Sequence, residues 1–338
     1  MNIPDSITCF DVLYSLASAD GRGDALFGDS IVYAGKVVER SLIGSSIPSF
    51  YLEFPLLGRP CFDILTVYDK VDPGACFAEG AGYGYQKMFD WFSHLPESHG
   101  ASCAIEVDTG SGETECAGVY MQQRRRKDLV APFLESVGED ARAGSYLKFM
   151  ERLPQGMSAA YAGLFPGREG SPMRIGGYMD KAFIDNASDD TSVLDRAFSS
   201  VGFGDHDPGM LELCSRLLAM SPAADYQFDI YPDGSVGDVF GLSLSFNDVL
   251  PNEAAECMNS GFGKDIMTTI QDLGLADDRW KMIAGASMGK GITVKKTDGR
   301  EVFLVFAIRL NYVKIKFKAG VPVFSKFYLI LQAAEMNR

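Results

Sequence analysis

The stretch that decides the fold is Arg309-Leu310-Asn311-Tyr312-Val313-Lys314-Ile315-Lys316-Phe317, which alternates between two kinds of side chain. Val313, Ile315 and Phe317 share one face of a strand, while Tyr312, Lys314 and Lys316 share the other. The short turn Lys318-Ala319-Gly320 then leads into a second strand-like run at 321–331. Strands joined so tightly must be antiparallel, because a parallel neighbour needs a long crossover.

Four similar pairs of strand-like runs come earlier in the chain, with helical stretches between them. The five predicted pairs are 50–56/61–68, 101–108/114–123, 157–164/172–180, 225–231/236–246 and 309–317/321–331. Ten antiparallel strands that alternate with helices predict an α+β fold: a ten-stranded antiparallel β-barrel built from five αββ units, with the helices outside. Closure into a barrel removes the sheet edges that an open sheet would have to protect.

The segments between the strand pairs are predicted from helical periodicity and breaker residues. Helices are expected at 5–19, at 24–41, in a stretch ending near Leu95-Pro96, at about 127–153 with breaks at Gly138 and Gly144, at 190–220 in two pieces, and at 252–283 in two pieces. The segment Gly285–Gly291 lacks the spacing of a phosphate-binding loop, so it is interpreted as a flexible turn. Val302–Ile308 either enters the final strand directly or forms an extra strand. We find no linker that would divide the chain, and predict one domain over 1–338.

Composition excludes several classes of function. The chain has 338 residues and a formal net charge of −14, which disfavours nucleic acid as a partner. It contains no apolar run long enough to span a membrane and no recognisable signal peptide at its start. Seven scattered cysteines without CxxC spacing indicate reduced thiols and a cytoplasmic location, and three histidines make a histidine metal site an unattractive prediction.

The second face of the strands is polar and rich in tyrosine. If the sheet were open, this face would simply meet water. Its tyrosines, and the Arg and Lys residues spaced two positions from other polar groups, favour a closed chamber instead. The members of this face are Tyr51, Glu53, Glu106, Asp108, Tyr120, Gln122, Arg174, Tyr178, Gln227, Asp229, Tyr231, Ser243, Ser245, Tyr312, Lys314, Lys316, Lys326 and Tyr328.

Five αββ units around a polar, tyrosine-rich lumen resemble the ABBA prenyltransferases, whose ten-stranded PT barrel transfers isoprenyl groups to aromatic acceptors. Two stretches, Tyr226–Tyr231 and Arg309–Phe317, are similar to that superfamily and especially to its peptide-modifying cyanobactin branch. The resemblance implies a bacterial transferase with an isoprenyl diphosphate donor and an aromatic small molecule or a peptide side chain as acceptor.

The resemblance also implies roles for individual residues. It places Glu53 on the acceptor as the catalytic carboxylate, which would take up the released proton. Clustered cations would stabilise the leaving diphosphate, and aromatic faces would attract the allyl cation. The implied cations are Arg174, Lys314, Lys316 and Lys326, and the implied shield is Tyr178, Tyr231, Tyr312 and Tyr328. No metal site and no obligatory cofactor are expected. Mg²⁺ is an optional bridge, because several acids on this face would otherwise repel diphosphate.

A second interpretation stays open at this point. The chain could be a non-catalytic barrel that binds a small molecule or a peptide, as an accessory protein in natural-product biosynthesis. Charge distinguishes the two interpretations, because diphosphate transfer needs at least three converging cations. A binding barrel would instead neutralise Lys314, Lys316 and Lys326 with Asp63, Glu106 and Asp229.

Overall fold

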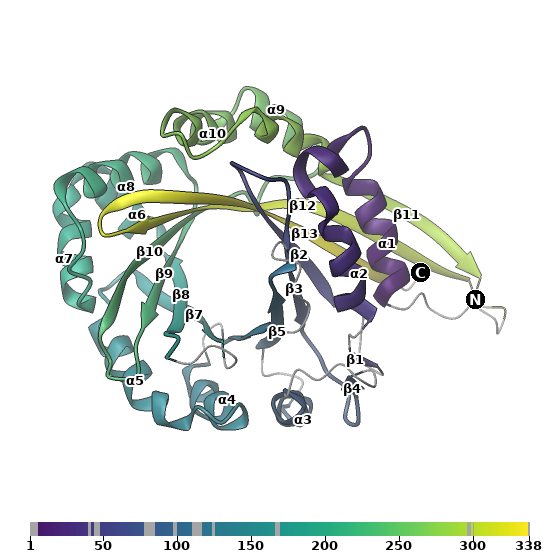
Figure 1. Ribbon diagram of the computed structural model, residues 1–338, viewed down its shortest axis with the longest axis horizontal. Coiled ribbons are helices and arrows are strands. Elements are labelled where there is room, and N and C mark those ends of the chain that lie inside the picture. The colour runs from purple at the N-terminus through teal and green to yellow at the C-terminus, as the bar shows by residue number, and fades with distance from the viewer. Residues whose placement is uncertain are drawn as a thin grey trace.

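The wall of the molecule is a closed ring of ten antiparallel strands (Figure 1). The computed structural model describes residues 6–39, 42–43, 48–77, 85–96, 100–109, 117–123, 126–165, 170–295, 299 and 301–336. Pairing of β10 with β12 closes the ring, so the predicted barrel is confirmed. The ring runs through β2 (Ser49–Pro55), β3 (Asp63–Tyr68), β5 (Ser102–Val107), β6 (Ala117–Gln122), β7 (Met157–Leu164), β8 (Met173–Met179), β9 (Ala224–Ile230), β10 (Val236–Ser245), β12 (Glu301–Lys318) and β13 (Val321–Met336).

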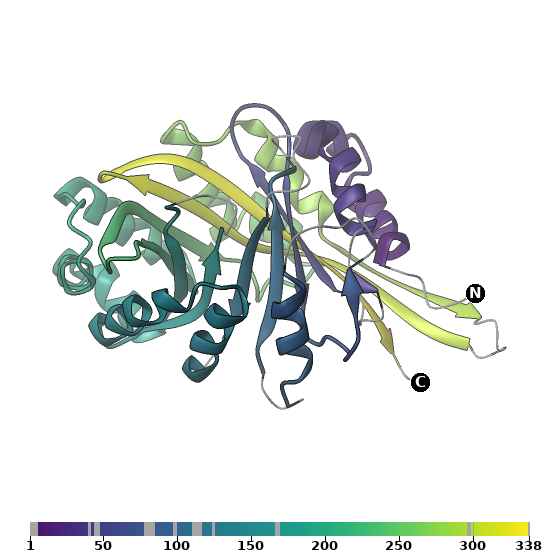
Figure 2. The same ribbon diagram turned by 60° about the horizontal axis from the view of Figure 1, so that its bottom comes forward.

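Helices surround this ring on its outer side (Figures 1 and 2). None of the helices in the described ranges combines the length and apolar character needed to cross a membrane. The helices are α1 (Ser6–Ala17), α2 (Ile31–Glu39), α3 (Gln86–Ser93), α4 (Val130–Ser136), α5 (Ala143–Arg152), α6 (Lys181–Asp189), α7 (Thr191–Val201), α8 (Pro208–Met220), α9 (Ala254–Asn259) and α10 (Phe262–Asp272), with short π or 3₁₀ turns η1 (Gly23–Phe27), η2 (Gly28–Ser30), η5 (Lys127–Leu129), η6 (Asp140–Arg142) and η7 (Asp278–Ala286).

Three local predictions need correction. The helix expected at 24–41 begins as a π turn and a 3₁₀ turn, and of its described residues only Ile31–Glu39 is α-helical. Gly138, with φ +78°, interrupts the helical region after α4 as expected, whereas Gly144 lies within the first turn of α5 and breaks nothing. The segment Gly285–Gly291 is not a turn, because it completes η7 and enters an eleventh strand. Helix α6 was not predicted at all.

The eleventh strand, β11 (Met288–Lys295), pairs only with the first half of β12 among the described strands. Val302–Ile308 is part of β12, so the apolar run does continue directly into the first strand of the final pair. Asn311 is an extra residue in β12, opposite the junction between Leu329 and Tyr328. At this bulge β12 changes its neighbour from β11 to β10, and its alternation shifts by one residue.

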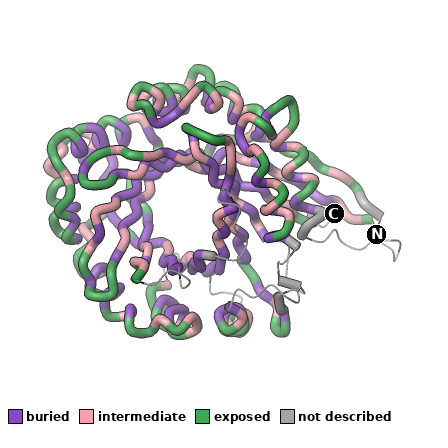
Figure 3. Tube along the Cα trace, in the orientation of Figure 1, coloured by how far each residue is buried: buried purple, intermediate pink, exposed green. Residues whose placement is uncertain are grey.

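The bulge keeps the apolar side chains of β12 on the helix-covered face throughout. Before it, Leu304, Phe306 and Ile308 are buried, and after it Val313 and Phe317 are buried on the same core cluster. A two-stranded sheet, β1 (Leu42–Ile43) with β4 (Cys76–Phe77), lies apart from the barrel. Figure 3 shows that buried segments follow the barrel wall and the inner sides of the helices, while exposed segments face outward.

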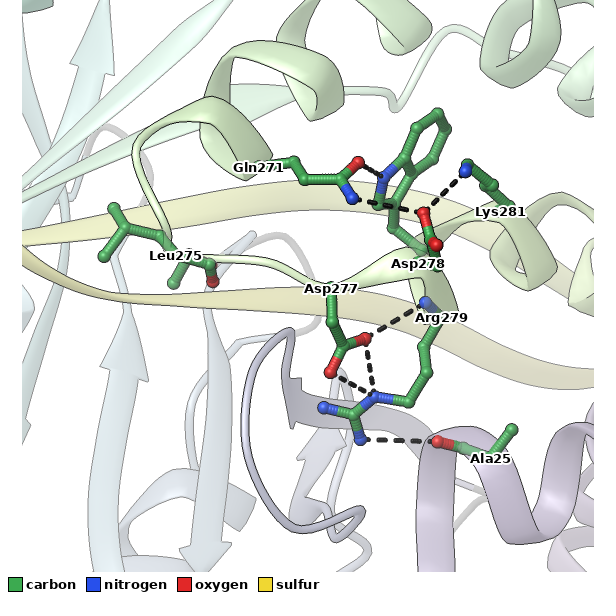
Figure 4. A network of polar contacts seen from close by, with 9 residues as sticks. Ala25, Gln271, Leu275, Asp277, Asp278, Arg279 and Lys281 are labelled. Atoms are coloured by element: carbon green, nitrogen blue, oxygen red, sulfur yellow. Dashed lines mark hydrogen bonds and ion pairs between the residues drawn. The ribbon is translucent and has the colours of Figure 1, made fainter.

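A polar network ties η7 to the elements around it (Figure 4). Arg279 donates to both carboxylate oxygens of Asp277, at 2.8 and 2.9 Å, and reaches the carbonyl of Ala25 in η1 at 3.4 Å. The indole of Trp280 donates to Gln271 of α10 at 2.8 Å. These contacts hold the segment before β11 against the N-terminal turns and α10.

Candidate functional site

Two small cavities lie on the inner face of the barrel. The larger, about 150 Å³, is lined by Glu53, Asp63, Glu106, Asp108, Gly118, Phe165, Arg174, Lys314, Lys316 and Lys326. The smaller, about 60 Å³, is lined by Glu53, Leu65, Ala104, Glu106, Tyr120, Gln122, Tyr161, Arg174, Gln227, Tyr312, Lys314 and Tyr328. Shared lining residues show that the cavities adjoin. One is dominated by charge and the other by tyrosines.

Lys326 is clamped between two carboxylates. Its Nζ lies 2.6 Å from Glu53 Oε1 and 2.7 Å from Asp63 Oδ2, bringing β13, β2 and β3 together. Burial opposes charge on Glu53, but the ammonium groups of Lys326, Lys314 and Lys316 prevail and lower its pKa. Burial raises the pKa of Asp63 to about 7 in spite of Lys326. Glu53 is therefore the ionised partner of Lys326, and near neutral pH Asp63 readily takes up a proton.

Lys314 has a different environment. It is 7% exposed, and its Nζ donates to the neutral Gln227 Oε1 at 3.0 Å. Its Nζ also lies 5.0 Å from the centre of the Tyr328 ring and 5.8 Å from that of Tyr312, within cation–π range. Burial lowers the pKa of Lys314 to about 8, against the opposing effect of Glu53. Lys314 is thus a buried cation close to its titration point.

Two further cations face the larger cavity. Arg174 of β8 lies 3.4 Å from Asp229, donates to the Tyr120 hydroxyl at 3.0 Å and covers the Phe165 ring. Lys316 has no hydrogen-bond or ion-pair partner within the described ranges, and burial followed by the charge of Arg174 lowers its pKa. The predicted cations therefore converge on one cavity but differ in pairing. Lys326 is held by carboxylates, Arg174 by Asp229, Lys314 by an amide, and Lys316 by no described residue.

Only two of the four tyrosines predicted to form the shield lie together in the lumen. Tyr312 and Tyr328 stack with ring centres 4.0 Å apart beside Lys314, and burial raises the pKa of both phenols. Tyr178 is 53% exposed at the end of β8 away from Arg174, and Tyr231 is 40% exposed in the turn after β9. The prediction that these two share one cavity with the lysines is wrong, because antiparallel register puts them at opposite ends of the β8–β9 pair.

Other aromatic rings occupy the lumen in their place. Tyr120, Tyr161 and Phe165 form a second cluster that packs against glycines on neighbouring strands. A Cβ built on Gly163 would lie 2.2 Å from the Tyr120 ring, and one on Gly176 would lie 2.1 Å from the Tyr161 ring. Tyr120 is in the polar set predicted above, but the sequence gives no role to Phe165 or Tyr161. The sequence feature that could have indicated them is the pairing of each ring with a glycine on the next strand, Tyr120 with Gly163 and Tyr161 with Gly176.

The larger cavity has equal numbers of acidic and basic side chains. Four carboxylates and four cations line it. In the described part of the chain, no three side chains of metal-binding type come close enough to form a preformed metal site. Mg²⁺ commonly uses only one or two carboxylates together with substrate phosphates. Asp63 and Asp108 are carboxylates of the kind such a shared site uses, but Asp63 is already paired with Lys326.

Comparison with known proteins identifies the fold. No protein-family model matches the sequence, and no curated protein matches it. Among solved structures, 5-dimethylallyltryptophan synthase from Streptomyces coelicolor aligns over 97% of this chain and 97% of its own, with a TM-score of 0.51 and 14% identity. The fold is the PT barrel.

A second match supports the same assignment. Prenyltransferase PriB, solved as a ternary complex with L-tryptophan and dimethylallyl thiolodiphosphate, aligns over 97% of this PT barrel and 96% of its own chain, with a TM-score of 0.52 and 12% identity. The resemblance to ABBA prenyltransferases inferred from the strand pairs is thereby confirmed for the fold. At this identity, the roles of individual lumenal residues remain predictions.

Proposed function

We propose that this PT barrel transfers an isoprenyl group from an allylic diphosphate to an aromatic small molecule or a peptide side chain. The observation that carries the proposal is the position of Lys314. This ammonium lies beside the stacked Tyr312 and Tyr328 and also lines the cavity of Arg174 and Lys316. Cations for a leaving diphosphate and aromatic faces for an allyl cation thus meet at one point.

The proposed chemistry balances as a substitution. The bond between the allylic carbon and the bridging oxygen of the donor breaks, and its electron pair leaves with the diphosphate. Arg174, Lys314 and Lys316 would stabilise that negative charge. The acceptor carbon or heteroatom forms the new bond and then loses a proton. Glu53 is ionised and is our proposed proton acceptor, with Lys326 holding it in place.

The two cavities that described residues line would have to widen for this reaction. Ligand pockets usually measure about 300–1,000 Å³, whereas the two cavities measure about 150 and 60 Å³. The rings of Tyr120 and Tyr161 line the smaller cavity, and the ring of Phe165 lines the larger one. We therefore expect these rings to change rotamer when donor and acceptor bind.

The alternative is a barrel that binds a small molecule or a peptide without catalysis. Two observations favour it: Lys326 is satisfied by two carboxylates, and the two lumenal cavities lined by described residues are small. The alternative retains the polar cavity but assigns its cations to internal charge balance. It predicts no turnover and no affinity for diphosphate.

The deciding experiment is incubation with dimethylallyl or geranyl diphosphate and a panel of tryptophan, tyrosine and cyclic peptides, with and without Mg²⁺, followed by mass spectrometry. We expect a prenylated product, and a loss of kcat/KM of about 10²-fold or more in Lys316→Ala. Lys318→Ala is the matched control, because Lys318 is exposed at the end of the same strand. Absence of product with every pair, together with no calorimetric binding of inorganic pyrophosphate, would leave the binding barrel as the function.

A further inference from the structure

Gln227 occupies an unusual place in the barrel wall. It lies at the centre of β9 and is 1% exposed, although its side chain is polar. At its register the neighbouring strand on each side carries a glycine: Gly176 on β8 and Gly241 on β10. No side chain therefore projects from the position next to this amide on either neighbouring strand.

The two glycines allow more distant strands to reach Gln227. Tyr161 comes from β7 across β8, and a Cβ at Gly176 would lie 2.2 Å from its hydroxyl oxygen. Lys314 comes from β12 across β10, and a Cβ at Gly241 would lie 3.8 Å from its Cδ and 3.1 Å from Gln227 Cβ. A Cβ at Gly176 would overlap the Tyr161 ring, whereas one at Gly241 would be in ordinary contact with Lys314 and tight against Gln227.

The Lys314 ammonium and the Tyr161 hydroxyl donate to the same atom. Gln227 Oε1 accepts from Lys314 Nζ at 3.0 Å and from the Tyr161 hydroxyl at 3.3 Å. A neutral acceptor fixes the direction of an ammonium but leaves its net charge in place, whereas a carboxylate largely cancels it. Lys326, held by two carboxylates, provides the contrast within the same lumen.

We propose that Gln227 is a positioning residue that holds the Lys314 ammonium toward the cavity without neutralising it, so that Lys314 stays available to an anionic group of the substrate. The inference rests on the proposed diphosphate-dependent function for its purpose, but the geometry it describes can be measured separately. Gln227 touches no reacting atom in this scheme and acts through Lys314.

Several charged groups also face Lys314 and set the background against which Gln227 acts. Glu53 comes from β2 and Glu106 from β5, and both favour the ammonium. Arg174 from β8 and Lys316 on the same strand disfavour it, and burial is the largest effect. Asp225 of β9 interacts with Lys314 as well. Because all of these stay in place, a change at Gln227 alone reports the contribution of its amide.

The test compares two substitutions with opposite expected effects. Gln227→Glu places a carboxylate on Lys314 and should raise the Lys314 pKa by about one unit or more. Gln227→Met removes the acceptor and should lower the Lys314 pKa below its wild-type value. The pKa is measured by NMR titration of protein containing ¹³Cε-labelled lysine, with the Lys314 resonance assigned by its absence in Lys314→Arg.

Binding of inorganic pyrophosphate, measured by calorimetry at pH 7, is the second readout. Gln227→Glu should weaken it by about tenfold, because the added carboxylate cancels one cation. Gln122→Glu is the matched control: it adds a carboxylate to the lining of the same small cavity, at a residue that makes no hydrogen bond to Lys314. It should shift the Lys314 pKa much less than Gln227→Glu does.

Shifts of opposite sign in the two Gln227 variants support the positioning role, since general damage to the fold would not produce them. Shifts of the same sign, or no shift, overturn it. If Gln227→Glu does not fold, Gln227→Met carries the test, and an unchanged Lys314 pKa overturns the proposal. If wild type binds no pyrophosphate while the pKa values respond as expected, the positioning of Lys314 stands and the proposed function fails.

Discussion

Asp225 shows how burial governs charge in this lumen at the scale of a single residue. It lies on β9 between Tyr178 on β8 and Ser243 on β10. Burial raises its pKa to about 7, against the opposing effect of Lys314. An unfolded Asp titrates near 3.9, so between about pH 4 and pH 7 the folded chain binds more protons than the unfolded chain. Its contribution to stability is complete below pH 4 and is lost as the pH rises through 7.

Asp225→Asn should therefore remove a pH-dependent cost. We expect its free energy of unfolding to exceed that of wild type by up to about 4 kcal/mol at pH 8 and to match it near pH 4. Urea denaturation at both pH values measures the difference. Asp189→Asn, at the exposed end of α6, is the control and should change stability equally at both. A constant offset between Asp225→Asn and wild type across this range would contradict the assignment.

At the scale of elements, the bulge in β12 decides which side chains enter the lumen. Asn311 is the extra residue, and its carbonyl accepts from the Phe246 amide at 2.7 Å where β10 ends. A shift of one residue moves every side chain of a strand to the opposite face. Without the bulge, Leu304, Phe306 and Ile308 would leave the helix-covered core when Lys314 and Lys316 face the lumen.

Deletion of Asn311 tests this directly. It should restore unbroken alternation and either expel the apolar side chains before it or bury the lysines after it, at a cost of about 4 kcal/mol or more in unfolding free energy. Asn311→Gly keeps the extra residue and should cost only about 1 kcal/mol. Chemical denaturation of both variants makes the comparison. Equal stability of the two would show that the length of the strand is not critical.

At the scale of the whole molecule, closure of the ring joins the helical layer into one continuous core. Buried side chains from α1 to β13 belong to a single cluster, and the first and last strand pairs are neighbours through β2 and β13. Such continuity is the reason to expect one folding unit over 1–338.

Calorimetric unfolding should then show one transition whose van't Hoff enthalpy equals the calorimetric enthalpy. A pair of substitutions sharpens the test: Phe50→Ala in β2 and Phe240→Ala in β10, both fully buried, should each lower the same single Tm. Two resolved transitions, with each substitution affecting a different one, would show separate domains.

The sequence by itself determined the five strand pairs, the antiparallel barrel and the face on which Lys314, Lys316 and Lys326 lie. Alternation with a period of two and short polar turns are local properties, so one chain read in order is enough to find them. Extrapolating that alternation to Tyr178 and Tyr231 failed, because a shared face does not give the height along the barrel axis.

Only the tertiary structure decided which charges are paired. Lys326 meets Asp63, 263 positions away in the chain, and Lys314 meets Gln227 across an intervening strand. Such contacts depend on the register between strands and on glycines that leave space beside the contacting side chains. Both are relations between neighbouring strands, so they cannot be predicted from the spacing of residues within one strand. The fold could therefore be predicted from local pattern, whereas the electrostatics of the lumen required the closed barrel.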